Sequence, residues 1–185
     1  GTSSAGCTKT ATITIMVNAK PSFSITSTPS TICVGSSSTL TASVTTNTYT
    51  WMPGSLTGTS IVVSPAATTT YTATATNAAG CTKTTTKTVT VNQLPNVQIN
   101  ATNATICLGA STSLTATGAS TYLWMPGALS GSTVNVSPSA TTTYTVTGTS
   151  TAGCTKTATV TIVVNATTND GDTTITACDN FTWNT

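Results

Sequence analysis

The chain has 185 residues, of which 4% are charged, 37% are hydrophobic and none is His, and its formal net charge is +2. A typical soluble domain is about a quarter charged, so solubility must come from the hydroxyls and amides of Thr, Ser and Asn. The small, scattered positive charge excludes nucleic-acid binding by neutralisation of phosphates. No apolar run is as long as the ~18 residues of a membrane span, so we expect no membrane insertion.

An internal repeat organises the sequence. Cys33 and Cys107 are 74 residues apart, Trp51 and Trp124 are 73 residues apart, and the residues around them match. A repeat of this regularity indicates one folded module used in series. We expect the C-terminal hairpin of a preceding repeat at 1–19, full repeats at 20–92 and 93–165, and the start of a following, different repeat at 166–185.

The first full repeat has the pattern of a succession of short strands. Apolar residues alternate with Ser and Thr around 23–25, 40–44, 49–51 and 61–63, and then along 69–76 and 82–91. Gly and Pro interrupt these runs, and no window has helical spacing. Six or seven short strands in each repeat predict an all-β fold of tandem immunoglobulin-like antiparallel β-sandwiches.

Two aromatic positions in each repeat are assigned to the fold. Trp51 and Trp124 fall in the third predicted strand, where a sandwich core places its largest residue. Tyr71 and Tyr144 follow a Pro-x-x-Thr-Thr-Thr segment. We expect each to act as a corner tyrosine that hydrogen-bonds the backbone, with a ligand-stacking platform as the alternative.

The six cysteines lie at fixed phases of the repeat, which favours disulfides and an oxidising compartment. Zinc is the rival interpretation, but there is no His and no close Cys-x-x-Cys pair. In an up-and-down succession of six strands, the turns after the first and fifth strands lie at one end of the sandwich. We therefore predict two bonds within repeats, Cys33–Cys81 and Cys107–Cys154. Cys7 and Cys178 are then unpaired within the chain.

The segment after the second repeat differs from the rest. It holds Asp170-Gly171-Asp172, a turn whose carboxylates are ligands of the kind calcium uses. A plain polar turn is the preferred interpretation, so we expect no cofactor.

The repeated residues resemble a known family. Thr-Ile-Cys-x-Gly-x-Ser-x-x-Leu-Thr-Ala, then Tyr-x-Trp, then Ser-Pro-x-x-Thr-Thr-Thr-Tyr-Thr, then Ala-Gly-Cys-Thr is similar to bacterial immunoglobulin-like and PKD-like repeats. Such repeats occur in very large secreted surface proteins of gliding bacteria that use type IX secretion. The tail Ala-Cys-Asp-Asn-Phe-Thr-Trp-Asn resembles a second repeat type of the same proteins. The resemblance implies a spacer or adhesin stalk.

The resemblance does not extend to metal binding. PKD-like domains often have an acidic Trp-Asp-x-Gly-Asp-Gly turn, whereas this chain has Trp51-Met-Pro-Gly54 without acids. Glycosylation is a further expectation. The pattern Asn-x-Ser/Thr occurs at Asn100, Asn103, Asn135, Asn165 and Asn180. Asp172-Thr173-Thr174 resembles the bacterial O-glycosylation motif linked to this family, with Thr173 as the acceptor.

An enzyme is not expected. The sequence has no His, Glu or Arg, and its three Asp lie in the last 16 residues, so no repeat can build an acid–base pair or an activated nucleophile. We favour a structural segment of an extracellular protein on the bacterial cell surface. It would act as a rigid stalk or fibre-forming adhesin whose partners are neighbouring repeats or copies of itself.

Two alternatives remain. Thr at every second position makes flat rows suited to surface glycans or to ordered water, including ice. Strands shared between copies would give assembly.

Overall fold

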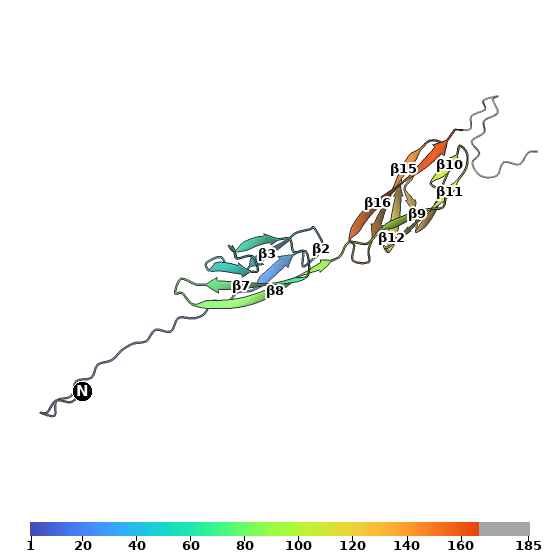
Figure 1. Ribbon diagram of the computed structural model, residues 1–185. Coiled ribbons are helices and arrows are strands. Elements are labelled where there is room, and N and C mark those ends of the chain that lie inside the picture. The colour runs from blue at the N-terminus through green and yellow to red at the C-terminus, as the bar shows by residue number, and fades with distance from the viewer. Residues whose placement is uncertain (167–185) are drawn as a thin grey trace, which may run out of the picture. The chain divides into compact units, whose positions relative to one another are not determined.

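The structure is a computed structural model that describes residues 1–166 of the chain. The described residues contain strands and no helix, and they divide into two units, Gly1–Val91 and Asn92–Thr185. Figure 1 shows strands β1–β8 in blue to green and strands β9–β16 in yellow-green to red. We call strands β1–β8 the first module and strands β9–β16 the second module.

Each module contains eight strands in the same order. The first module has β1 (Ile25–Thr28), β2 (Thr31–Cys33), β3 (Ser38–Ala42), β4 (Thr48–Met52), β5 (Leu56–Thr57), β6 (Ser60–Val63), β7 (Thr69–Thr76) and β8 (Thr82–Asn92). The second has β9 (Gln98–Ala101), β10 (Thr105–Cys107), β11 (Thr112–Thr117), β12 (Thr121–Met125), β13 (Leu129–Ser130), β14 (Thr133–Val136), β15 (Thr142–Thr149) and β16 (Thr155–Asn165).

The strands of each module form a three-stranded and a five-stranded sheet. The orders are β1-β3-β6 and β2-β8-β7-β4-β5 in the first module, and β14-β11-β9 and β10-β16-β15-β12-β13 in the second. The all-β, immunoglobulin-like sandwich expected from the sequence is therefore confirmed. The sandwich is not purely antiparallel, because β10 pairs with β16 in parallel.

Period-two alternation explains which side chains form the core. In β7 the residues Tyr71, Ala73 and Ala75 are buried, while the Thr residues between them face outward. The largest buried side chain of each module is a tryptophan, Trp51 or Trp124, and both are fully buried. Their indole N–H groups donate to Gly58 O at 2.8 Å and Gly131 O at 3.0 Å. Each core is thus built around a ring whose one polar atom is satisfied.

The second strand of each module, β2 or β10, lies beside the last strand, β8 or β16, and β10 runs parallel to β16. In the second module Cys107 of β10 lies opposite Asn165, the last residue of β16. In the first module Thr90 N of β8 donates to Ser30 O, which corresponds to the bond from Val163 N to Ala104 O in the second. The chain therefore comes in at one end of a module, its N-terminal end, and leaves at the opposite, C-terminal end.

The short strands β5 and β13 were not predicted. Each has two residues and pairs antiparallel with the Trp-containing strand before it, through Trp51↔Leu56 and Trp124↔Leu129. Each of these two strands adds one reversal of chain direction that the prediction of six strands lacks. Every later turn of the module therefore lies at the opposite end of the sandwich from the predicted end.

Residues 1–19 retain one element of a repeat. Ser3 N donates to Cys7 O, and Gly6 N donates to Ser3 O. The turns that end at Cys81 and Cys154 make the same pair of bonds. Residues 9–19 carry no strand, and Ile15 and Val17, at the phases of buried Val89 and Val91, are 78% and 91% exposed. The turn of the expected hairpin is present without a following strand, so the C-terminal hairpin of a preceding repeat at 1–19 stays a prediction.

Two glycines of the second module share a positive φ but differ in the space around them. Gly118 and Gly109 both have positive φ, +89° and +87°. A Cβ on Gly118 would lie 1.8 Å from the carbonyl oxygen of Asn96, whereas a Cβ on Gly109 would meet nothing within 4 Å.

We therefore expect Gly118→Ala to destabilise the second module by clearly more than Gly109→Ala. Gly109→Ala should cost only the backbone strain, about 1 kcal/mol. Amide hydrogen exchange of β11 and β15 measures the effect, with β3 and β7 of the unchanged first module as internal reference. Equal effects of the two substitutions would contradict the close approach to Asn96.

Candidate functional site

Threonines cover the outer face of the five-stranded sheet in both modules. In the first module four Thr pairs lie opposite each other across β7 and β8, namely Thr70↔Thr88, Thr72↔Thr86, Thr74↔Thr84 and Thr76↔Thr82. The second module repeats them as Thr143↔Thr161, Thr145↔Thr159, Thr147↔Thr157 and Thr149↔Thr155. Strand geometry spaces such rows by about 6.8 Å along a strand and about 4.8 Å across strands. The face is thus a regular grid of methyl and hydroxyl groups.

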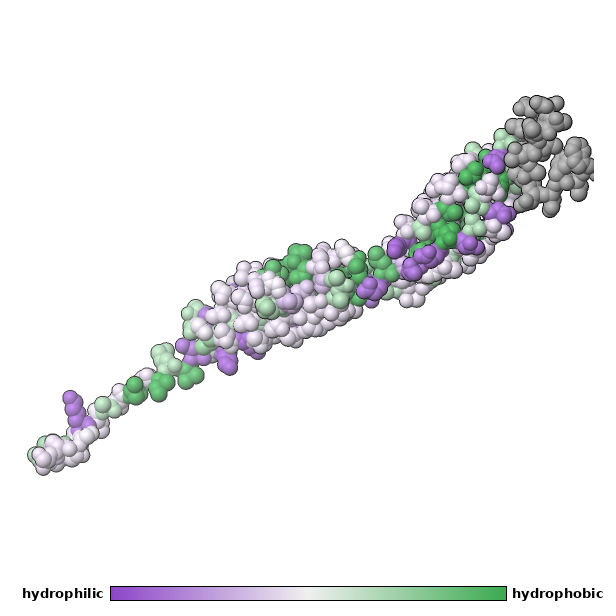
Figure 2. Space-filling view, viewed as in Figure 1, coloured by the Kyte–Doolittle hydropathy of each residue, from purple (hydrophilic) through white to green (hydrophobic). Residues whose placement is uncertain are grey.

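Some of these hydroxyls bond each other. Thr70 Oγ1 lies 2.8 Å from Thr88 Oγ1, and Thr143 Oγ1 lies 2.9 Å from Thr161 Oγ1. Cross-strand pairs of this kind stabilise a sheet by about 0.2–1 kcal/mol each. Figure 2 shows near-neutral, pale residues over most of the visible surface, with few strongly hydrophilic ones. The Thr grid therefore helps to stabilise the five-stranded sheet and makes its outer face polar but uncharged.

The cysteines lie at the two ends of each module. Cys107 ends β10 at the C-terminal end, beside Asn165. Cys154 is buried and precedes Thr155, the first residue of β16, at the N-terminal end. Since β16 spans 11 residues, the two cysteines are separated by roughly 33 Å. A disulfide requires Cα atoms within about 7 Å, so Cys107 and Cys154 cannot bond each other.

The pairing predicted from the sequence is therefore wrong in both modules. Cys33, Cys107 and Cys154 are each disulfide-bonded, whereas Cys81 and Cys7 are free thiols. Cys33 thus does not bond Cys81. The physical reason is the unpredicted strand β5 or β13, which reverses the chain once more and carries the Cys81 and Cys154 turns to the other end. Cys178 lies outside the described residues.

The N-terminal end of each module holds its cysteine against the incoming chain. Cys81 Sγ lies 3.6 Å from the carbonyl oxygen of Asn18, and Cys154 Sγ lies 3.9 Å from that of Asn92. The Asn77 amide also donates to Ala19 O at 2.9 Å. Asn18 and Asn92 occupy the same phase of the repeat, so the arrangement is shared by both modules.

The tyrosines that hold the backbone differ from those predicted. The hydroxyl of Tyr49 donates to Val44 O at 2.6 Å, and that of Tyr122 donates to Ala119 O at 2.9 Å. These are the tyrosines two residues before the core tryptophans, and the corner role expected for Tyr71 and Tyr144 belongs to them. Tyr49 falls with Trp51 in the strand predicted at 49–51, but the alternation of that strand does not indicate which backbone group its hydroxyl reaches.

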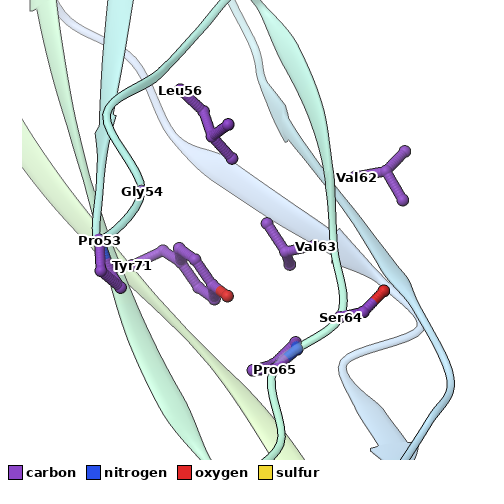
Figure 3. A pocket seen from close by; sticks show the side chains of 8 residues that line it. All are labelled: Pro53, Gly54, Leu56, Val62, Val63, Ser64, Pro65 and Tyr71. Carbon is purple, nitrogen blue, oxygen red and sulfur yellow. The ribbon is translucent and has the colours of Figure 1, made fainter.

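Tyr71 and Tyr144 are buried and line equivalent open pockets. The first pocket, of about 330 Å³, lies between Pro53, Leu56, Val63 and Tyr71, and Figure 3 shows the Tyr71 hydroxyl directed into it. The second, of about 340 Å³, has Tyr144 in the same place. Burial raises the pKa of both tyrosines above the usual value. The lining is mainly apolar, and its polar side chains are uncharged, Ser64 and Tyr71 in the first pocket and Asn135, Ser137 and Tyr144 in the second.

The remaining predicted sites are placed as follows. Asn100, Asn103, Asn135 and Asn165 are exposed. Thr173, Asn180 and the candidate calcium ligands Asp170 and Asp172 lie outside the described residues. Within residues 1–166, no three His, Cys, Asp or Glu side chains cluster as metal ligands would, and no helix is long and apolar enough to cross a bilayer.

Comparison with known proteins gives structural matches only. No protein-family model matches the chain, and no curated protein sequence matches it. An adhesin described as Ca²⁺-stabilised and as helping an Antarctic bacterium bind ice matches with 19% identity and a TM-score of 0.46, over 80% of this chain and 50% of its own. The fibronectin(III)-like modules of Clostridium thermocellum CbhA match with 12% identity and a TM-score of 0.39, over 77% of this chain and 95% of theirs.

Murine CEACAM1b matches with 13% identity and a TM-score of 0.37, over 79% of this chain and 100% of its own.

The exchanged tyrosine roles give a direct prediction. Tyr49→Phe removes a short hydrogen bond to Val44 O and should destabilise the first module by about 1 kcal/mol. Tyr71→Phe, the matched control, should change stability little, because the structure shows no bond from its hydroxyl. Hydrogen exchange of β3 and β7 measures both variants, and 1 kcal/mol corresponds to roughly five-fold faster exchange. A larger effect of Tyr71→Phe would restore the corner role to that residue.

Proposed function

We propose that the chain is a structural segment of an extracellular bacterial surface protein and acts as a stiff stalk or as part of an adhesin fibre. One observation carries the proposal. The second strand of a module lies beside its last strand, and β10 runs parallel to β16, so the chain comes in at one end and leaves at the other. Modules that are crossed in this way are suited to extending a tandem array.

The connection between modules supports stiffness. Only residues 93–97 separate β8 from β9. Within this connection Pro95 and Val97 are buried, and Val97 belongs to the core of the second module. A linker whose side chains pack into the following module has little conformational freedom, and proline restricts it further.

The chemistry of the surface supports a mechanical role over a catalytic one. The outer sheet faces present Thr in place of titratable groups, and the two pockets have no charged lining. Three disulfide-bonded cysteines support an oxidising compartment, which is the extracellular space for a bacterial surface protein. Exposed Asn100, Asn103 and Asn135 leave room for glycosylation of this surface.

Small-angle scattering tests the proposal on the 185-residue chain. The matched control is a variant with eight Gly-Ser residues inserted between Gln93 and Leu94, which leaves both modules unchanged. We expect the unmodified chain to give a narrow distribution of module-to-module distances and the variant a broad one. Identical broad distributions would contradict a stiff stalk.

The Thr grid favours a second candidate function, binding of glycans or of ordered water such as ice. Its support is the regular spacing of the rows and the repetition of the same grid in both modules. Rows of hydroxyls that bond each other have fewer groups left for a ligand, which is why we place this function second.

A substitution in the grid discriminates the two functions. Thr147→Lys places a charge in the middle of the grid, and Thr117→Lys places one on the outer face of the opposite sheet. If the grid binds glycans or ice, Thr147→Lys should reduce glycan-array signal or thermal hysteresis several-fold and Thr117→Lys should leave it intact. Absence of both activities from the unmodified chain excludes this function.

A further inference from the structure

The side of each sandwich where edge strands of its two sheets face each other has the features of a binding site for an extended peptide. We propose that β6 accepts a strand of a partner polypeptide along its free edge, and that an apolar side chain of that strand enters the pocket at Tyr71. Strand β14 and the pocket at Tyr144 repeat the site in the second module. The inference concerns each module taken separately and does not depend on the proposed function.

Strand β6 is the outer strand of its sheet and has no neighbour on one side among the described residues. In the order β1-β3-β6 it pairs with β3 alone, and β14 has the same place in β14-β11-β9. Proline and charged side chains commonly protect an edge strand from pairing. Strand β6 reads Ser-Ile-Val-Val and β14 reads Thr-Val-Asn-Val, so neither strand has such protection. Both edges are therefore open to a further strand.

The hydrogen-bond pattern shows which residues of β6 bond to β3. In antiparallel strands, alternate opposite pairs exchange both of their backbone bonds. Ala42 N donates to Thr59 O at 2.9 Å, so the next bonded residues on this side lie two and four positions after Thr59. These residues are Ile61 and Val63, which lie opposite residues of β3.

The alternate residues of β6, Ser60 and Val62, direct their N–H and C=O groups to the free edge. The equivalent bond from Ala116 N in the second module assigns the same position to Thr133 and Asn135. Each site thus offers two backbone donors and two backbone acceptors to an added strand. Main-chain bonds of this kind are the source of affinity when a peptide extends a sheet.

The pocket lies on the same side of the module as this free edge. Leu56 of β5 and Val63 of β6 both line it, together with Tyr71 of β7. Because β5 and β6 are edges of different sheets, the pocket opens at the side of the sandwich, between the two sheets. Figure 3 shows Val63 on the pocket side of its strand and Val62 on the other side. A strand added about 4.8 Å beyond β6 covers this opening.

The alternation of side chains decides what the added strand presents to the pocket. Every second side chain of a strand points to the same face, so every second one faces inward, toward Tyr71. The lining is mainly apolar and uncharged, and its volume of about 330 Å³ leaves room for a side chain such as leucine. An apolar inward side chain gains by burial, whereas a charged one loses its hydration. The Tyr71 hydroxyl, which is directed into the pocket, can donate to a carbonyl of the bound strand.

A second copy of β6 does not meet these requirements. Its inward residues, Ile61 and Val63, are buried in the core of their own module. A copy that paired edge to edge would therefore have no side chain left for the pocket. An extended segment outside a folded core has its inward side chains available. The geometry thus favours a strand of another polypeptide, uncharged and with apolar residues at alternate positions.

Nuclear magnetic resonance tests the proposal on the 185-residue chain, with the synthetic peptide acetyl-Thr-Val-Thr-Leu-Thr-Val-Thr-amide as probe. In the free chain, the amides of Ser60 and Val62 should exchange rapidly with water. At a peptide concentration ten times the dissociation constant, this exchange should slow about ten-fold. Nuclear Overhauser contacts should join the Leu methyl groups of the peptide to the Tyr71 ring. Unchanged exchange in millimolar peptide would overturn the proposal.

Matched substitutions separate the backbone contribution from that of the pocket. Val62→Pro removes one N–H of the free edge, where a proline costs no bond to β3, and Val62→Thr keeps that N–H. We expect Val62→Pro to weaken peptide binding to the first module several-fold and Val62→Thr to leave it nearly unchanged. A peptide with Asp in place of Leu should also bind more weakly, because the pocket offers its charge no partner. Equal affinity of the two variants, or of the two peptides, would contradict the proposal.

Self-association is distinguished by the same measurement. If a second copy occupied the edge, exchange at Ser60 and Val62 would slow as the concentration of the chain alone is raised. We expect no such dependence in the absence of peptide. Slowing by the chain alone would show that the edge takes a second copy and would refute the proposed partner.

Discussion

The pairing of the second strand of a module with its last strand, parallel between β10 and β16, is the constraint on which the rest depends. A sandwich whose chain came in and left at one end would fold back on itself and could not extend an array. Here Cys107 lies opposite Asn165, so the chain comes in at one end of a module and leaves at the other. The two ends differ in chemistry. One end presents a cysteine after a short edge strand. The other presents a cysteine in the β7–β8 or β15–β16 turn, held against the incoming chain.

Most of the fold could be predicted because one face of each strand is buried. The alternation that marks Leu40 and Ala42 in β3, or Tyr71 and Ala73 in β7, follows from a core on one side and water on the other. The Trp positions followed from size, since a small sandwich has room for one such ring. The chain direction could not be obtained in this way. Strand β5 has two exposed residues, Leu56 and Thr57, so it leaves no alternation in the sequence.

That one unpredicted reversal is why the disulfide pairing came out wrong. The cysteines, their phases and their oxidised chemistry are features of the sequence, but which turns share an end is a property of the topology. The tyrosines illustrate the same limit, because a hydrogen bond such as that from Tyr49 to Val44 O depends on where a loop returns. The uncharged Thr faces, in contrast, were predictable from the sequence, since Thr at every second position of a strand must share one face.

The modules contribute length because the chain comes in at one end of each and leaves at the other. That direction of travel rests on the parallel pairing of β10 with the end of β16. Nuclear Overhauser contacts between backbone protons of the two strands test it most directly. We expect contacts that pair Thr105 with Val163 and Cys107 with Asn165. Contacts in the reverse order, with Thr105 beside Asn165 and Cys107 beside Val163, would contradict a chain that leaves each module at the opposite end.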